Sequence, residues 1–124
     1  MNGGAILLAC LMLATSSAIA EENGARLFEP CRACHSLDPA ARNLPGPNLS
    51  SLPGRKVGGD AEFDYSPVLR KASADGLVWD AARLDTFLTD PAAMFPGLWM
   101  ATRGVEDATE RRALVQFLLD PSSR

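Results

Sequence analysis

The sequence predicts a small all-α protein with three to five short helices and long loops. No stretch alternates apolar and polar residues as a β-strand does, and no tight hairpin turn is evident. Several short segments place apolar residues three and four positions apart, which is the spacing of one helix face. Residues 36–67 contain five prolines and four glycines and are predicted to be loop.

The first predicted helix covers residues 22–30. Gly24 and Phe28 lie four positions apart and therefore share one face of it. Pro30 is expected to end this helix, because proline breaks the helical hydrogen-bond pattern. A brief second helix is predicted over residues 67–72, opened by a proline.

The third predicted helix covers residues 81–88. Asp80 precedes it and is expected to cap its first turn. Its apolar face is made by Leu84, Phe87 and Leu88. Pro91 is expected to end it, and residues 92–100 are predicted to be a second loop.

The last predicted helix begins after Asp107. Asp107 and Glu110 have the spacing of a capping box. The apolar face that follows is made by Leu114, Phe117 and Leu118. Pro121 is expected to end this helix.

Residues 1–20 are interpreted as a signal peptide. They contain no charged side chain, and an apolar run is followed by small residues ending in Ala-Ile-Ala. Cleavage after Ala20 would leave residues 21–124 as one domain. Two alternatives stay open, namely an uncleaved N-terminal anchor and a lipoprotein processed at Cys10. The run is shorter than the roughly 20 residues that a membrane span needs, so no stable membrane insertion is expected.

Residues 21–124 carry all 12 basic and 15 acidic side chains, a net charge of −3. Only two of the basic residues are lysines, and no basic stripe exists that could neutralise phosphates. Nucleic acid is therefore excluded as an expected partner. Export would place the protein in the periplasm, an oxidising compartment.

The long central loop suggests that the domain encloses something. A compact domain rarely holds about thirty residues without secondary structure unless they have a function. A chain of this length with so few long helices also builds a small core. A large apolar group at the centre would account for both features.

Cys31, Cys34 and His35 form the pattern C-x-x-C-H, which is typical of c-type haem attachment. Two thiols with this spacing can add to the two vinyl groups at one edge of a haem, and the adjacent imidazole can bind the iron. Two other uses of this motif are a redox disulfide and a zinc site. A redox disulfide usually follows a strand in a βαβ unit, which is not predicted here. A zinc site needs about four ligands, of which this motif supplies three.

The iron's other face needs a second ligand. His35 is the only histidine in the chain, so two histidine ligands are excluded. Met94 and Met100 are the soft candidates in residues 21–124, and the composition does not choose between them. A His/Met pair would raise the reduction potential.

Taken together, these motifs resemble the class I c-type cytochromes, in the branch of mitochondrial cytochrome c and its bacterial periplasmic relatives. The similarity runs from about Gly24 to Leu118. It includes a glycine and an aromatic residue on the first helix, the haem motif, a loop tryptophan and a last-helix pair. The matching positions are Gly24, Phe28, Cys31 to His35, Gly46-Pro47-Asn48-Leu49, Gly54-Arg55-Lys56-Val57-Gly58, Trp79, Pro96-Gly97-Leu98-Trp99-Met100, Leu114 and Phe117.

The resemblance implies a small cytochrome c fold, with loops wrapped around one haem c bound through Cys31 and Cys34. It implies Met100 as the second axial ligand and leaves Met94 in the core or at the surface. The carbonyl of Pro47 would accept a hydrogen bond from His35 and fix the orientation of the imidazole.

The resemblance also implies partners for the haem propionates. Arg55 would help to neutralise one propionate, and Tyr65 and Trp79 would donate hydrogen bonds. Gly24 would let the first helix approach Phe117 closely.

Three positions depart from the family pattern. Phe87 stands where many relatives carry tyrosine, Leu98 replaces a hydroxyl residue, and Thr102 occupies a place often held by an aromatic residue. The family's ring of lysines is absent, so the positive field that steers basic members to acidic partners is not expected.

The resemblance thus implies a periplasmic one-electron carrier, monomeric or part of an oxidoreductase, that exchanges electrons with redox proteins and is not itself an enzyme. The alternative is a dedicated cytochrome subunit of a periplasmic oxidoreductase. A third hypothesis is ligand-binding or peroxidase-like chemistry, which would require a labile Met100.

Overall fold

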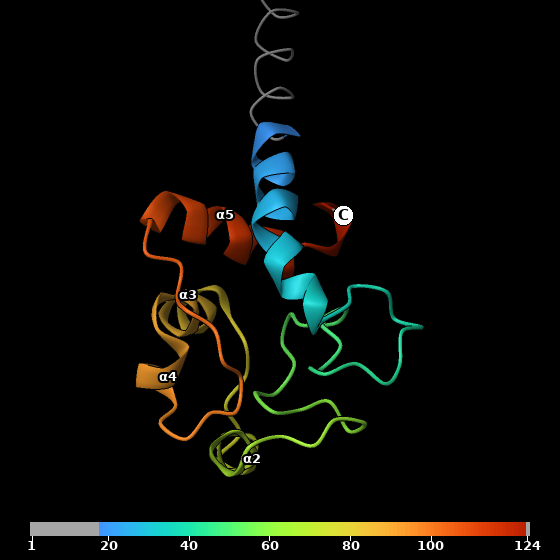
Figure 1. Ribbon diagram of the computed structural model, residues 1–124, viewed down its shortest axis with the longest axis vertical. Coiled ribbons are helices and arrows are strands. Elements are labelled where there is room, and N and C mark those ends of the chain that lie inside the picture. Colours follow the sequence, from blue (N-terminus) through green and yellow to red (C-terminus); the bar gives the residue numbers. More distant parts are fainter. Residues whose placement is uncertain (1–17, 124) are drawn as a thin grey trace, which may run out of the picture.

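A computed structural model describes residues 18–123 (Figure 1). In these residues the chain forms an N-terminal helix over residues 18–28, followed in order by η1 (Glu29–Ala33), α2 (Pro67–Ala74), α3 (Ala81–Thr89), α4 (Pro91–Met94), α5 (Ala108–Leu119) and η2 (Pro121–Ser123). This confirms the all-α prediction for the described part of the chain. The proposed lipidation at Cys10 and residues 1–17 of the predicted signal peptide lie outside it.

Aspartates begin three of the helices, because each carboxylate accepts a hydrogen bond from a free N–H of the first turn. Asp80 accepts from the N–H of Arg83 at 2.7 Å, and Asp107 accepts from the N–H of Glu110 at 2.8 Å. Both caps were predicted. Asp90 caps α4 in the same way, since it accepts from the N–H of Ala93 at 3.0 Å.

The predicted ends of the first and third helices are confirmed to within two residues, since the N-terminal α-helix ends at Phe28 and α3 ends at Thr89. Beyond the α-helix the chain forms the 3-10 helix η1 as far as Ala33, with Pro30 in its first turn. Pro91 was expected to lead into a loop, but it occupies the first turn of α4. In both cases proline lies where a helix has no use for its missing N–H.

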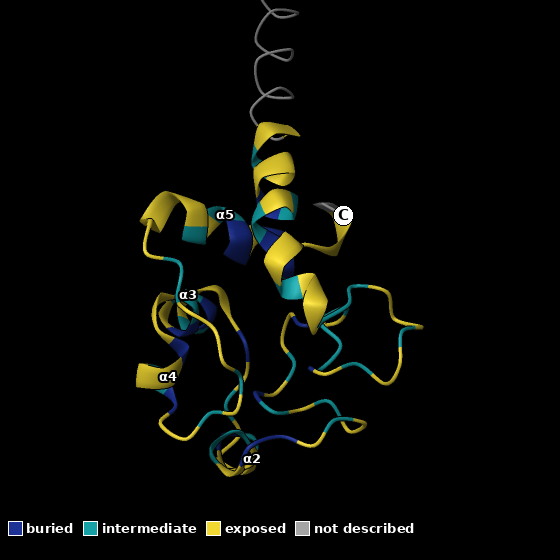
Figure 2. Cartoon of the chain, viewed as in Figure 1, coloured by how far each residue is buried: buried dark blue, intermediate teal, exposed yellow. Residues whose placement is uncertain are grey.

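The N-terminal helix crosses α5, and α3 packs beside α5 (Figure 1). The rings of Phe28 and Phe117 meet at the crossing with their centroids 5.9 Å apart. Asp85 of α3 and Arg111 of α5 form an ion pair of 2.8 Å. Buried residues concentrate where these helices face each other (Figure 2).

The long central loop is closed by a backbone clamp. Val57 donates to the carbonyl of Leu77 at 2.8 Å, Trp79 donates to the carbonyl of Arg55 at 2.9 Å, and Gly54 donates to the carbonyl of Trp79 at 3.2 Å. These bonds amount to an isolated bridge rather than a sheet. They hold the two ends of the α2-containing loop together.

The core draws on the loops as well as the helices. Its buried members are Phe28, Leu52, Val57, Ala72, Trp79, Leu84, Phe87, Phe95, Leu114, Val115, Phe117 and Leu118. A second set of side chains is only partly buried against them, and this set includes Cys31 and Met100. Of the residues proposed to hold the haem, Cys31 and Met100 therefore border the core and Trp79 belongs to it.

Candidate functional site

The C-x-x-C-H motif lies on one tight turn. η1 carries Cys31, whose carbonyl accepts from the N–H of Cys34 at 3.1 Å and from the N–H of His35 at 3.0 Å. Both thiols are free. Cys31 is half-buried against the core and Cys34 is exposed, and burial raises the pKa of the Cys31 thiol. The turn thus presents two unpaired sulfurs and an imidazole together.

One nitrogen of His35 is fixed by the following loop. His35 Nδ1 lies 2.7 Å from the carbonyl oxygen of Pro47. Because a carbonyl can only accept, Nδ1 carries the proton and Nε2 keeps its lone pair. Burial also lowers the pKa of His35, which favours the neutral imidazole that metals bind.

Gly46 makes this arrangement possible. Its N–H donates to the carbonyl of Cys34 at 2.8 Å. A Cβ at this position would lie only 2.7 Å from His35 Cε1. No larger residue could bring the carbonyl of Pro47 to the imidazole on this path.

The Met100 loop follows α4. The N–H of Leu98 donates to the carbonyl of Phe95 at 3.0 Å, and Gly97 between them has a left-handed backbone with φ of 92°. Met94 and Met100 are both partly buried against the core. Burial does not distinguish the two methionines, and Met100 as the second iron ligand remains a prediction.

Three polar groups of the loop between residues 55 and 66 point to an anionic partner. Arg55 Nη1 donates to the carbonyl of Asn48 at 2.7 Å, while its Nε is buried without a partner. Ser66 is 2% exposed and its Oγ is also unpartnered. Tyr65 Oη accepts from the N–H of Asp60 at 3.1 Å, so its own proton is left to donate. Unmet buried polar groups are costly unless a ligand satisfies them.

Ser66 was missed by the sequence analysis. It precedes the proline that opens α2, so it has the position of a helix cap. Its side chain makes no capping hydrogen bond. Only the buried and unpartnered hydroxyl marks it as a candidate site residue.

Trp79 is tied to Arg55 through the backbone clamp. Its indole is buried and meets the ring of Phe87 edge-on, with centroids 5.2 Å apart. Phe87 in turn lies 6.1 Å from Phe95. Trp79 thus joins the proposed propionate partners to the aromatic core beneath the Met100 loop.

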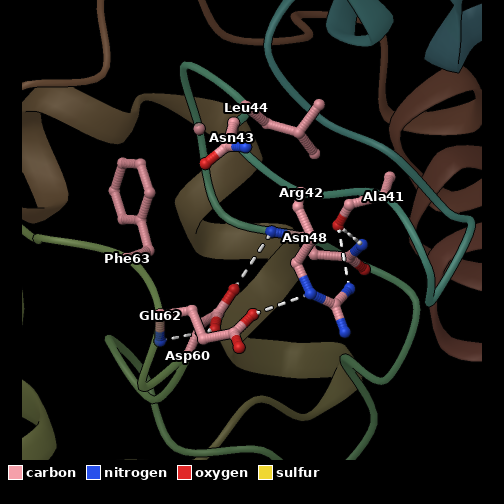
Figure 3. Close-up of a pocket in the computed structure, with 9 residues that line it drawn as sticks. Ala41, Arg42, Asn43, Leu44, Asn48, Asp60, Glu62 and Phe63 are labelled. Carbon is pink, nitrogen blue, oxygen red and sulfur yellow. Dashed lines mark hydrogen bonds and ion pairs between the residues drawn. The ribbon is translucent and has the colours of Figure 1, made fainter.

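A polar pocket of about 410 Å³ lies behind the Pro47 segment (Figure 3). An ion pair of 3.1 Å between Arg42 and Glu62 joins the two loops that form its walls. Asp60 accepts from the N–H of Asn48 at 3.2 Å and from the N–H of Glu62 at 3.0 Å. The pocket walls therefore brace the residue that follows Pro47.

This set of residues fits a covalently bound haem. The two free thiols suit the vinyl groups, the free Nε2 of His35 suits the iron, and the unpartnered Arg55 Nε and Ser66 Oγ suit propionates. Within residues 18–123 no group of three or more His, Cys, Asp or Glu side chains is arranged so that it could hold a metal ion.

Known proteins with similar sequences and structures are cytochromes. The chain is 37% identical over 100 residues to cytochrome c2 of Agrobacterium tumefaciens (strain II Chrys), covering 81% of this chain and 90% of that protein. It is 39% identical over 97 residues to cytochrome c2 of Rhodoplanes tepidamans, covering 78% and 88%. Cytochrome cH from Methylobacterium extorquens superposes with a TM-score of 0.69 at 34% identity, covering 78% and 94%.

A scan against protein-family profiles finds no match. The relatives are nevertheless similar over most of both chains, and they agree with the haem-binding chemistry of the site. The cofactor is accordingly one covalently attached haem c, and the function is electron transfer. The chain belongs to the bacterial cytochrome c2 and c-550 group of class I c-type cytochromes.

Proposed function

We propose that this protein carries single electrons between redox proteins of the periplasm, with the haem ligated by His35 and Met100. The observation that most directly supports this proposal is the 2.7 Å contact between His35 Nδ1 and the carbonyl oxygen of Pro47. This bond holds the ring in one orientation and leaves Nε2 as a ligand. When bound, the haem supplies an iron that cycles between the ferric and ferrous states.

The chain's residues would fix the haem at its edges and faces. Cys31 and Cys34 would form thioether bonds at the edge where η1 ends. Met100 would approach the face opposite His35 from the loop after α4. A thioether ligand stabilises ferrous iron and so raises the reduction potential.

The propionates would be held by the loop that precedes and begins α2. Arg55 supplies charge through its unpartnered Nε, Ser66 supplies its buried hydroxyl, and Tyr65 supplies its remaining proton. Trp79 would donate its indole N–H. Burial raises the pKa of Tyr65, which keeps the phenol protonated and able to donate.

Periplasmic location follows from the predicted signal peptide and from cytochrome c chemistry, not from the fold. A search of the described residues finds no helix with the length and hydropathy needed to span a bilayer. We propose cleavage after Ala20, which would shorten the N-terminal helix but keep Gly24 and Phe28.

Electron transfer needs no acid, base or nucleophile from the protein, and we propose that the chain is not itself an enzyme. The relatives named cytochrome c2 and c-550 favour a free carrier over a dedicated subunit. Gel filtration of the protein from its native source separates the two. Elution with a larger catalytic chain would contradict the free-carrier proposal.

A redox titration with optical spectra tests the proposal directly. The purified holoprotein should show one reversible one-electron step and, in the ferric state, the charge-transfer band of methionine-ligated haem c. A colourless protein with the mass of the bare polypeptide would contradict the proposed function.

A further inference from the structure

Trp99 is the most exposed large apolar side chain within residues 18–123, with 61% of its surface accessible. Its neighbours Leu98 and Met100 are partly buried against the core. The backbone on both sides of the indole is therefore anchored, while the indole itself faces solvent. This places an exposed tryptophan one residue from the proposed axial ligand.

The residues next to Trp99 in the sequence carry no charged side chain. Residues 91–102 contain no acidic or basic side chain, although charged residues make up 22% of the sequence. Residues 43–54, which include the His35 partner Pro47, are also free of charge. The segment that carries Trp99 and Met100 thus supplies no charge of its own for electrostatic steering, whereas Arg42, Asp60 and Glu62 lie beside the Pro47 segment.

We propose that Trp99 anchors the docking of a redox protein, and that this partner receives the indole in an uncharged, apolar pocket rather than through a patch of opposite charge. The proposal rests on the proposed function. Tryptophan is enriched among the few interface residues that dominate binding energy. Burial of the indole would bring the partner beside Met100 and so shorten the path to the haem.

The proposed transfer step moves a single electron between the two proteins. One electron passes from the ferrous protein to the oxidised centre of the partner, so the first is oxidised and the second reduced. No bond forms or breaks, and no proton is required. Trp99 contributes the affinity and orientation of the complex, not the redox chemistry.

The test follows oxidation of the ferrous holoprotein by a mixture of membranes and periplasm from the source bacterium. Wild type is compared with Trp99→Ala, Trp99→Phe and the control Val78→Ala, which trims an apolar side chain that is 40% exposed on a different loop. The reduction potential and the oxidation rate with tris(phenanthroline)cobalt(III) are measured for each variant, because both report on the haem without a protein partner.

The expected result is a loss of about tenfold or more in the second-order rate for Trp99→Ala, with Trp99→Phe and Val78→Ala within about threefold of wild type. The wild-type rate should change less than about threefold between roughly 20 and 300 mM salt. The cobalt rates and potentials should agree among all variants.

Equal rates of wild type and Trp99→Ala would overturn this inference and leave the carrier function intact. A steep fall of the wild-type rate with salt would do the same, since it would show docking by charge. A shifted potential in Trp99→Ala would make Trp99 a part of the haem environment instead. A wild type that exchanges electrons with cobalt but not with the extract would overturn the proposed function itself.

Discussion

Gly24 and Phe117 meet so closely that no side chain fits between them. A Cβ at Gly24 would lie 2.4 Å from Phe117 Cβ and 3.1 Å from the carbonyl oxygen of Ala113. Glycine is thus required where the N-terminal helix crosses α5. The family resemblance implied this contact, and the structure confirms it.

Gly24→Ala should destabilise the holoprotein by about 1–3 kcal/mol, because the added methyl overpacks the crossing. The sign of this change in stability is informative, since the same substitution in an unhindered helix interior would stabilise the helix by about 1 kcal/mol. Denaturant unfolding of the ferric protein measures the effect. Asn23→Ala, an exposed change on the same helix, is the matched control, and a Gly24→Ala protein as stable as that control would refute the contact's importance.

Met100→Ala should abolish the methionine charge-transfer band and lower the reduction potential, on the order of 0.1 V or more. The physical reason is loss of the thioether that favours ferrous iron. Met94→Ala is the matched control and should keep both the band and the potential. If the two variants exchange these outcomes, Met94 is the ligand.

Ser66→Ala should cost the holoprotein about 1 kcal/mol, the net value of one buried hydrogen bond. Without haem the same change should be neutral or stabilising, because it removes a buried hydroxyl that has no partner. Unfolding curves of both forms give the comparison, and Ser51→Ala on an exposed loop position serves as control. A cost that is the same in both forms would argue for a purely structural role.

Arg55→Leu should lower the reduction potential, because a positive charge beside the haem favours the ferrous state. Arg26→Leu removes an arginine whose side chain is 65% exposed, and should leave the potential nearly unchanged. Equal shifts in the two variants would mean that only net charge matters.

Tyr65 should give stability a dependence on alkaline pH. Its pKa in the folded protein is raised, chiefly by burial, so folding favours the neutral phenol. This contribution is fully present below about pH 10, the ordinary tyrosine value, and is lost as pH rises through the raised folded pKa. Tyr65 is the only tyrosine, so the tyrosinate absorbance reports on it alone. Tyr65→Phe should unfold with a shallower pH dependence above pH 10, and an unchanged slope would contradict this assignment.

The sequence predicted the helices best where a cap and an apolar face coincide, as they do from Asp80 and from Asp107. It placed the helix ends at Pro30 and Pro91 correctly but not the helical turns that these prolines open, because proline ends one helix and begins the next with the same chemistry. A single residue cannot show which of these will occur. The Asp-Pro pair at residues 90–91 was the overlooked sign of α4.

The haem motif and Pro47 were predictable because their spacing follows from covalent chemistry and from family resemblance. Ser66 was not, since its role depends on being buried without a partner, and burial arises only when distant segments pack. The polar pocket behind Pro47 was missed for the same reason. Arg42 and Glu62 are twenty positions apart and form no local pattern.

The backbone clamp between Arg55 and Trp79 has a consequence for engineering. Its three hydrogen bonds hold both ends of the intervening loop. A structural change within that loop therefore need not alter the geometry of the cysteine motif. Gly76 is exposed, has open space around it and lies next to Leu77, one of the clamp residues. A peptide tag or an electrode linker attached there would therefore be held at a fixed point by the clamp.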